Sequence, residues 1–388
     1  MNTKIVKSLL VILSPTLDFS QGPIGKVTVI ETNKEEIKKI ANRCVLLAKN
    51  DWDNYETSWD FESSPFLSPD FFNTKIETTY KNIRKDWKKN IEEMKFLEEE
   101  NNKIFISKYG LKNELSPDVP LHEITLNCNP AYRYGKKITE NEQEVRICSD
   151  TIKEFISYSV GCMFGRFSID KKGLILINKG ENLEDFLKHV PNPTFKPDDD
   201  NVIPILDLDW FEDDITSRFK QFLRVSFGEA DFEENLRFIE TKIGKDIRKY
   251  FLNDFYREHI QTYKKRPIYW MFSSPKNSFN ALIYAHRYQK DTISIILDKY
   301  LQEFMLKLRA EKNTLERLEI SSSSSSRDKT IAMRKTQKID SILNELNSWE
   351  RDVIFPLASQ RLEIDLDDGV KNNYSKFGVA LKKISGLK

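Results

Sequence analysis

The stretch KIETTYKNIRKDWKKNIEEMKFLEEEN, residues 75–101, decides the fold class of this chain. Charged residues fill the intervals between apolar residues that recur every three or four positions: Ile76, Tyr80, Ile83, Trp87, Ile91, Met94 and Leu97. This spacing places the apolar side chains on one face of an α-helix, which repeats about every 3.6 residues. We therefore expect a long amphipathic helix with one buried face.

The same periodicity predicts helices over 4–13, 33–50, 150–165, 211–226, 231–242 and 245–263. Between residues 290 and 360, two helical patterns flank the six serines of 321–326, which predicts a helical hairpin with a flexible tip. Short strands are expected over 26–30 and 174–177. The predicted fold class is therefore mainly α with mixed α/β portions, and it combines several helices with few short strands.

Composition excludes several classes of protein. The chain has 388 residues, enough for two or three domains, and its 61 Lys and Arg against 60 Asp and Glu leave a net charge of +1. It is therefore not a uniformly basic nucleic-acid coat, and any electrostatic surface must be local. Four cysteines without a CxxC pair disfavour a zinc ribbon or a disulfide framework and favour a cytoplasmic location. The apolar run 6–13 is too short to span a membrane, so no membrane partner is expected.

Glycine and histidine spacing gives no sign of a bound cofactor or metal. The 13 glycines form neither GxG nor GxxxxGK, which disfavours a phosphate or nucleotide cradle. His122, His189, His259 and His286 are far apart in the sequence and form no HExxH. We therefore expect no catalytic, cofactor-binding or metal-binding residue in this chain.

Two local motifs have both a structural and a functional interpretation. Asn129–Tyr132 reads NPAY, close to the NPPY that holds a flipped adenine in amino-methyltransferases, but its third residue is alanine and we favour a structural turn. Eight acidic residues lie between Pro197 and Asp214 without one Lys or Arg. Paired carboxylates there could hold Mg²⁺ for phosphodiester cleavage, but we favour a solvated loop before a helix N-terminus.

The opposite charge dominates residues 245–290, where ten cationic against three acidic residues give a local net charge of +7 among eleven aromatic residues. Cations neutralise phosphates, while aromatic and amide side chains can contact bases or sugars. The candidate DNA-binding residues are Lys264, Lys265, Arg266, Trp270, Ser273, Lys276, Asn280 and Arg287. Pro267 is expected to end a helix beside the three consecutive cations, and Asn280 and Arg287 are the candidates for reading base edges. A solvated charged face over an aromatic core remains the alternative.

Five strings resemble the C-terminal part of PglX, the adenine-specific DNA methyltransferase family of BREX phage defence. They are KRPIYWMFSSPKNSFNALIYAHRY (265–288), VGCMFGRFSID (160–170), NDWDNYETSWDFESSPF (50–66), EITLNCNPAYRYG (123–135) and IDLDDGVKNNYSKF (364–377). In that family the S-adenosylmethionine-binding domain with NPPY lies upstream of a target-recognition region and a C-terminal domain. The resemblance therefore implies a chain without a complete Rossmann-like methyltransferase domain, derived from a split gene or a truncation and inactive alone.

The resemblance also implies a role and a division of the chain. We expect a non-catalytic segment that positions double-stranded DNA for N6-adenine methylation and that binds no S-adenosylmethionine itself. Its partners would be DNA, the upstream methyltransferase domain and other BREX subunits. The alternatives are an adaptor that docks those subunits and, less favoured, a metal-dependent nuclease. The expected parts are a remnant of the recognition region (1–31), a helical connector with an aromatic loop (32–110), a DNA-engaging α/β domain (111–290), and a helical hairpin with a tail (291–388).

Overall fold

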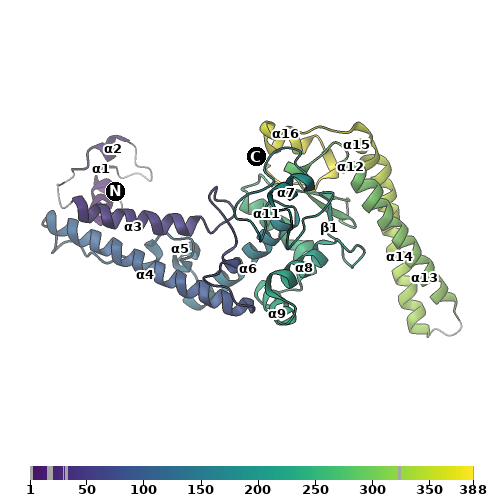
Figure 1. Cartoon of the computed structure of the whole chain (residues 1–388), viewed down its shortest axis with the longest axis horizontal. Helices are drawn as coiled ribbons and strands as arrows, with labels where there is room; N and C mark the ends of the chain where they lie inside the picture. Colours follow the sequence, from purple (N-terminus) through teal and green to yellow (C-terminus); the bar gives the residue numbers. More distant parts are fainter. Residues whose placement is uncertain (1–2, 15–20, 29, 31–33, 322–324, 388) are drawn as a thin grey trace. The chain divides into compact units, whose positions relative to one another are not determined.

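The computed structural model describes residues 3–14, 21–28, 30, 34–321 and 325–387. The chain divides into two compact units, Met1–Thr151 and Ile152–Lys388, and helix α6 contains the boundary between them (Figure 1). None of the helices in the described part combines the length and apolarity needed to cross a membrane.

Unit 1 is helical. Its helices are α1 (Lys4–Leu13), α2 (Gln21–Gly25), α3 (Lys34–Trp52), α4 (Ile76–Lys108), α5 (Pro130–Tyr134) and the first half of α6 (Glu140–Met163). The predicted amphipathic helix is confirmed as α4, and the apolar positions from Ile76 to Met94 are buried on one face. Helix α3 packs along α4, and the Arg43 guanidinium donates to both carboxylate oxygens of Glu93 at 2.5 and 2.7 Å (Figure 1).

Two regions of unit 1 depart from helical structure. The aromatic loop between α3 and α4 is held by buried rings of Phe61 and Phe66, with the turn η1 (Pro65–Leu67) at its centre, whereas Trp59 is 95% exposed. The strand expected over 26–30 is wrong for the residues that are described there: Lys26 is in a turn, and neither Val27 nor Thr28 pairs with a strand. Residue 29 lies outside the described residues.

Unit 2 contains a small antiparallel sheet that the sequence periodicity did not predict. The described residues form the strand order β1-β3-β2, with β1 (Ile203–Pro204), β2 (Tyr269–Ser273) and β3 (Asn280–Tyr284). Every residue of the three strands is buried, so both faces of the sheet are covered and no alternation of apolar and polar residues marks the strands. The C-terminal segment extends the sheet, because Leu381 bridges to Phe272 and the Lys382 N–H donates to the Met271 carbonyl at 2.8 Å.

The strand expected over 174–177 is also wrong. Its backbone is extended, with the Ile175 N–H donating to the Arg166 carbonyl and the Leu176 N–H to the Gly165 carbonyl, but it joins no sheet. These bonds tie it to the turn after α6, where Gly165 has φ +73° and a Cβ would lie 3.0 Å from Leu176 Cδ1. The segment is thus fixed by close packing against a glycine rather than by strand pairing.

The helices of unit 2 follow the predicted pattern with shifted ends. They are α7 (Leu183–His189), α8 (Ile215–Phe227), α9 (Phe232–Ile243), α10 (Ile247–Tyr250), the π-helical turn η3 (Phe251–Phe255), α11 (Tyr256–Thr262), α12 (Thr292–Ile295), the π-helical turn η5 (Ile296–Gln302), α13 (Glu303–Ile320), α14 (Ser326–Trp349), the π-helical turn η6 (Glu350–Ile354), α15 (Phe355–Gln360) and α16 (Gly369–Ser375).

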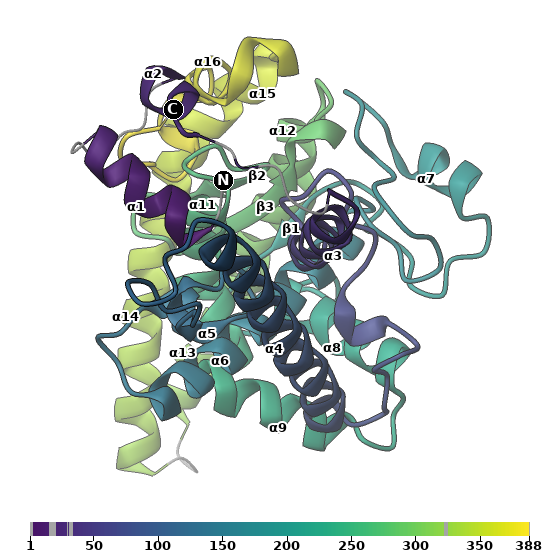
Figure 2. The same cartoon turned by 90° about the vertical axis from the view of Figure 1, so that its left-hand side faces the viewer.

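The predicted hairpin is confirmed as α13 and α14, which run side by side away from the sheet (Figures 1 and 2). Apolar residues along both helices belong to the same buried cluster as Trp270, Phe272 and Phe279 of the sheet region. The base of the hairpin is therefore part of the core of unit 2.

Candidate nucleic-acid interface

The three consecutive cations form a turn, which we call the basic turn (Lys264–Arg266), between α11 and β2. Lys264 and Lys265 have φ values of 51° and 64°, a left-handed conformation that costs a non-glycine residue about 1 kcal/mol or more. Backbone bonds that end the helix hold it: the Lys265 N–H donates to the Ile260 carbonyl at 2.8 Å and the Arg266 N–H to the Tyr263 carbonyl at 2.9 Å. The helix does end before Pro267, as predicted.

A buried histidine fixes the exit of the basic turn. His259 Nε2 accepts hydrogen bonds from the N–H groups of Ile268 and Tyr269, each at 3.2 Å. Burial, reinforced by the Arg166 charge, lowers the pKa of His259 to about 3, so the imidazole is neutral at pH 7 and can accept both bonds. The backbone on both sides of the basic turn is thereby anchored.

The side chains of the basic turn are exposed, and the described residues contain no ion pair to Lys264, Lys265 or Arg266. Their position after the last turn of α11 is favourable in itself, because cations stabilise the negative end of a helix dipole. The Lys265 ammonium lies along the C-terminal segment, since a Cβ at Gly386 would be 2.8 Å from its Nζ. Three unpaired positive charges thus stand on a rigid backbone and face solvent.

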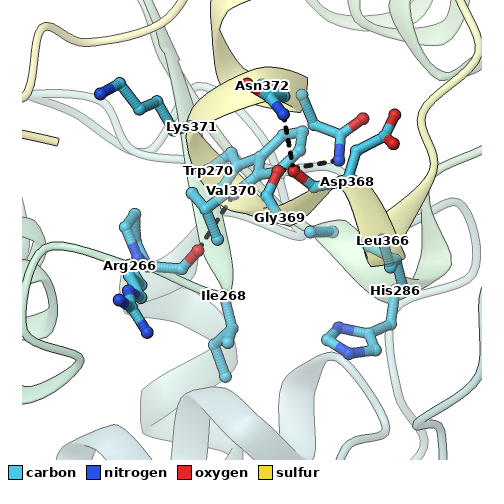
Figure 3. Close-up of a pocket in the computed structure, with 13 residues that line it drawn as sticks. Arg266, Ile268, Trp270, His286, Leu366, Asp368, Gly369, Val370, Lys371 and Asn372 are labelled. Carbon is cyan, nitrogen blue, oxygen red and sulfur yellow. Dashed lines mark hydrogen bonds between the residues drawn. The ribbon is translucent and has the colours of Figure 1, made fainter. Parts of the chain in front are cut away.

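Arg266 also borders a cavity of about 460 Å³ between the start of β2 and α16 (Figure 3). Figure 3 shows Arg266 and Lys371 on the side of the cavity opposite His286. Its apolar lining comes from Pro267, Ile268, Trp270, Ala285, Leu366 and Val370, and its polar lining includes Asp368, Asn372 and Asn373. Burial lowers the pKa of His286 to about 4, so this imidazole is neutral at pH 7. The mixed lining suits a ligand with an apolar body and an anionic group.

Helix α16 is held in place beside this cavity by Asn373. Its side chain is 1% exposed, and its Nδ2 donates to the carbonyls of Asp365 and Gly369 while its Oδ1 accepts from the Asp365 N–H. Lys371 on the same helix is exposed and is, with Arg266, the second cation that lines the cavity. Apolar periodicity does not predict this short helix, although the DDG and NN residues of 367–373 signal a short capped turn.

Lys276 is exposed but lies apart from the basic turn. It occupies the turn between β2 and β3, and the five residues of β2 separate the two positions by about 17 Å at 3.3 Å per residue. Its N–H donates to Glu345 Oε1 at 2.6 Å, and the Ser278 hydroxyl donates to Glu345 Oε2 at 2.6 Å. The β2–β3 turn is therefore docked on an acidic residue of α14.

The other four candidate residues are buried, which corrects their assignment as surface contacts. Trp270 packs edge-on against Tyr374 and Phe377 and donates its indole N–H to the Pro267 carbonyl. Ser273 and Asn280 face each other across β2 and β3, with the Ser273 hydroxyl donating to Asn280 Oδ1 at 2.7 Å. These side chains satisfy one another inside the sheet and present nothing to a base.

Arg287 is the clearest correction, because its side chain is only 3% exposed. Its guanidinium donates to the carbonyls of Asp198 at 2.9 Å, Asp199 at 3.2 Å and Phe164 at 3.3 Å. It thus joins the end of α6 to the acidic segment and to the residues after β3. An arginine with this set of internal partners is a structural residue, and no base edge can reach it in this conformation.

Several carboxylates of the acidic run 198–214 already have partners within the chain. Asp214 is fully buried, caps α8 by accepting from the Thr216 and Ser217 N–H groups, and pairs with Arg248 at 2.9 Å. The Tyr300 hydroxyl donates to Asp200 and Asp213. No group of three His, Cys, Asp or Glu in the described part of the chain is arranged to hold a metal ion. These contacts favour the structural interpretation over the nuclease.

Asn129 of the NPAY motif likewise has a structural role. It is 2% exposed and caps α5, with its Oδ1 accepting from the Ala131 N–H. Its Nδ2 donates to the carbonyls of Leu121 at 2.7 Å and Ile124 at 2.8 Å. The amide that would hold an adenine in an NPPY motif is fully engaged here, which agrees with the predicted turn.

Comparison with known proteins found relatives over the whole chain, although no family model matches it. The chain is 34% identical over 403 residues to the adenine-specific methyltransferase BrxX of Escherichia coli O9:H4 (strain HS). It is 31% identical over 402 residues to the adenine-specific methyltransferase PglX of Lacticaseibacillus casei (strain Zhang). Both alignments cover 100% of this chain but only 32% and 31% of the relatives, so the chain spans about a third of their length.

Proposed function

This chain belongs to the BREX PglX family of adenine-specific DNA methyltransferases, and we propose that it is the non-catalytic C-terminal segment that positions duplex DNA. The basic turn is the observation that carries the proposal. Its three unpaired cations would contact phosphates, while the anchored backbone would limit the conformational entropy lost on binding. The contacts would set the position of the duplex rather than read its sequence.

In the complete enzyme, we propose that S-adenosylmethionine donates the methyl group in an upstream domain and that this segment presents the duplex to that domain. The described residues do not fit the cofactor: their sheet is antiparallel, and no strand leads through a glycine-rich turn into a helix. Methyl transfer would therefore take place in the upstream domain. In the cytoplasm, methylation of the host sites would distinguish host from phage DNA, with other BREX subunits as further partners.

The test is a fluorescence anisotropy titration of the full chain with a labelled duplex between 50 and 200 mM salt. Replacing Lys264, Lys265 and Arg266 together by Ala should weaken binding to every sequence and flatten the log–log salt slope by roughly two to three units, at about 0.9 per phosphate. A matched control replaces Lys85, Lys89 and Lys108 of α4 by Ala, because these lysines are exposed and form no ion pair within the described structure. Unchanged affinity and slope in the basic-turn variant would remove this turn from the DNA interface.

A second candidate function is the adaptor, which Trp59 favours. The indole of Trp59 is 95% exposed on a loop whose Phe61 and Phe66 rings are buried, and tryptophan is a residue type enriched at the centres of protein interfaces. The same titration separates the two proposals, because an adaptor without DNA affinity would give no salt-dependent anisotropy change with the unmodified chain. Loss of co-purification with BREX subunits in Trp59→Ala would then support docking.

A further inference from the structure

Helix α14 carries two stripes with the same spacing on different faces. Ala332, Thr336, Ile339 and Leu343 are buried, and they recur at intervals of four, three and four residues. The second stripe, five residues earlier, is exposed and consists of Arg327, Ile331, Arg334 and Lys338. Because each residue turns the helix by about 100°, this exposed stripe lies about 140° from the buried one. We call it the basic stripe of α14.

Charge is segregated along the hairpin. Residues 326–338 of α14 hold five cations and one acid, a net charge of +4, whereas 339–349 hold two acids and no cation. Helix α13 balances four cations with four acids. A helical face that only required solvation would mix the signs, as α13 does.

The cations of the basic stripe are not neutralised by strong ion pairs within the described part of the chain. In the described part of the hairpin, Arg327 and Arg334 have no ion pair. Lys338 Nζ lies 3.7 Å from Asp207 Oδ2, but this lysine is 70% exposed, and a pair so exposed contributes little. The positive charge is therefore available to a ligand.

We propose that the basic stripe of α14 binds the phosphate backbone of duplex DNA as a second contact, remote in the sequence from the basic turn. The inference rests on the proposed function, in which this chain engages DNA. From Arg327 to Lys338 the stripe extends about 16 Å along the helix at 1.5 Å per residue, so it offers a line of charge to a linear polyanion. Ile331 is its one apolar member, which leaves little of the buried apolar core that a protein partner would require.

The hairpin geometry suits such an arm. The ends of α13 and α14 that meet, Ile320 and Ser326, lie at the end of the hairpin far from the sheet (Figures 1 and 2). The basic stripe occupies this outer half of α14, and the acidic inner half docks the β2–β3 turn through Glu345. The inner half of α14 is therefore fixed to the core of unit 2, whereas the outer half, which holds the basic stripe, lies away from the sheet.

The experiment uses the full chain and a labelled duplex of arbitrary sequence, titrated from 50 to 200 mM salt. The variant Arg327→Gln, Arg334→Gln, Lys338→Gln should flatten the log–log slope by roughly two to three units, at about 0.9 per phosphate. The affinity ratio of unmodified chain to variant should then fall roughly 15- to 60-fold over this fourfold salt range. Arg327→Lys with Arg334→Lys retains the charge and should retain the slope. Thermal melts by circular dichroism establish that each variant is folded.

Three outcomes distinguish this inference from the proposed function. A flattened slope in the stripe variant, beyond that of a control with Gln at Lys85, Lys89 and Lys108, supports the inference. Equal effects in the stripe variant and the control would mean that only total charge matters. An unchanged slope would show that the stripe does not contact phosphates. Either result overturns the inference. If the basic-turn variant still weakens binding in those cases, the proposed function stands. An unmodified chain without salt-dependent DNA binding overturns both.

Discussion

Replacing Arg287 by Ala should destabilise unit 2 rather than change DNA sequence preference. The guanidinium is buried and donates to three carbonyls from two separate segments, those of Phe164, Asp198 and Asp199. Its removal leaves these oxygens without a donor in a site that water reaches poorly. It also removes a positive charge near Asp198, whose pKa is already raised to about 7 by burial and by the neighbouring Asp200.

The expected loss follows from these contacts. Hydrogen bonds to a charged donor contribute about 1.5–3 kcal/mol each. The variant no longer bears the cost of burying a cation, but it leaves buried carbonyl groups unpaired, and this penalty offsets part of that gain. We therefore expect the free energy of unfolding to fall by about 3–5 kcal/mol, the range found when one partner of a buried ionic contact is removed. Urea unfolding followed by tryptophan fluorescence reports on this unit, because Trp270 and Trp349 are buried in its core.

Lys290 supplies the matched control, three residues further along. It pairs with Glu363 on the surface, and the two side chains are 55% and 62% exposed. Lys290→Ala should therefore change the free energy of unfolding by no more than about 0.5 kcal/mol. Equal effects of the two substitutions would contradict the buried geometry of Arg287. So would a stable Arg287→Ala protein with relaxed sequence preference, since that side chain would then contact bases.

Two further predictions concern pH and the cofactor. The folded pKa of His259 is about 3, below the unfolded value of about 6.5, so only the unfolded chain binds a proton as pH falls below 6.5, and stability is lost there. The difference in free energy of unfolding between the unmodified chain and His259→Gln should therefore shrink by about 2 kcal/mol from pH 7 to pH 5. Urea titrations at both pH values measure it. A difference that does not change with pH would mean that the imidazole is not buried and neutral. Calorimetry with S-adenosylmethionine should show no binding to the isolated chain, and micromolar affinity would place the cofactor site in this segment.

Local sequence was sufficient for the long amphipathic helices, although not for short capped ones such as α16. The period of apolar residues in α4 and in the α13–α14 hairpin predicts these elements, because each buries a single face and the other face remains charged. Capping residues decided the ends: α8 begins at Ile215 rather than near 211 because Asp214 accepts from the first free N–H groups. The periodic pattern alone contains no information on which flanking acid takes that role.

Tertiary structure alone decided the sheet and the division of the cations. Strands β2 and β3 are buried on both faces, so their sequences lack the alternation of apolar and polar residues that predicts a strand. Lys264 and Arg287 contribute equally to the net charge of +7 over 245–290, yet one faces solvent after the end of α11 and the other binds three carbonyls in the interior. The sequence by itself determined that positive charge and aromatic rings concentrate in this region. A cation remains free to bind a phosphate only if the folded chain brings no carbonyl within hydrogen-bonding distance of its guanidinium or ammonium group. That proximity exists only in the tertiary structure.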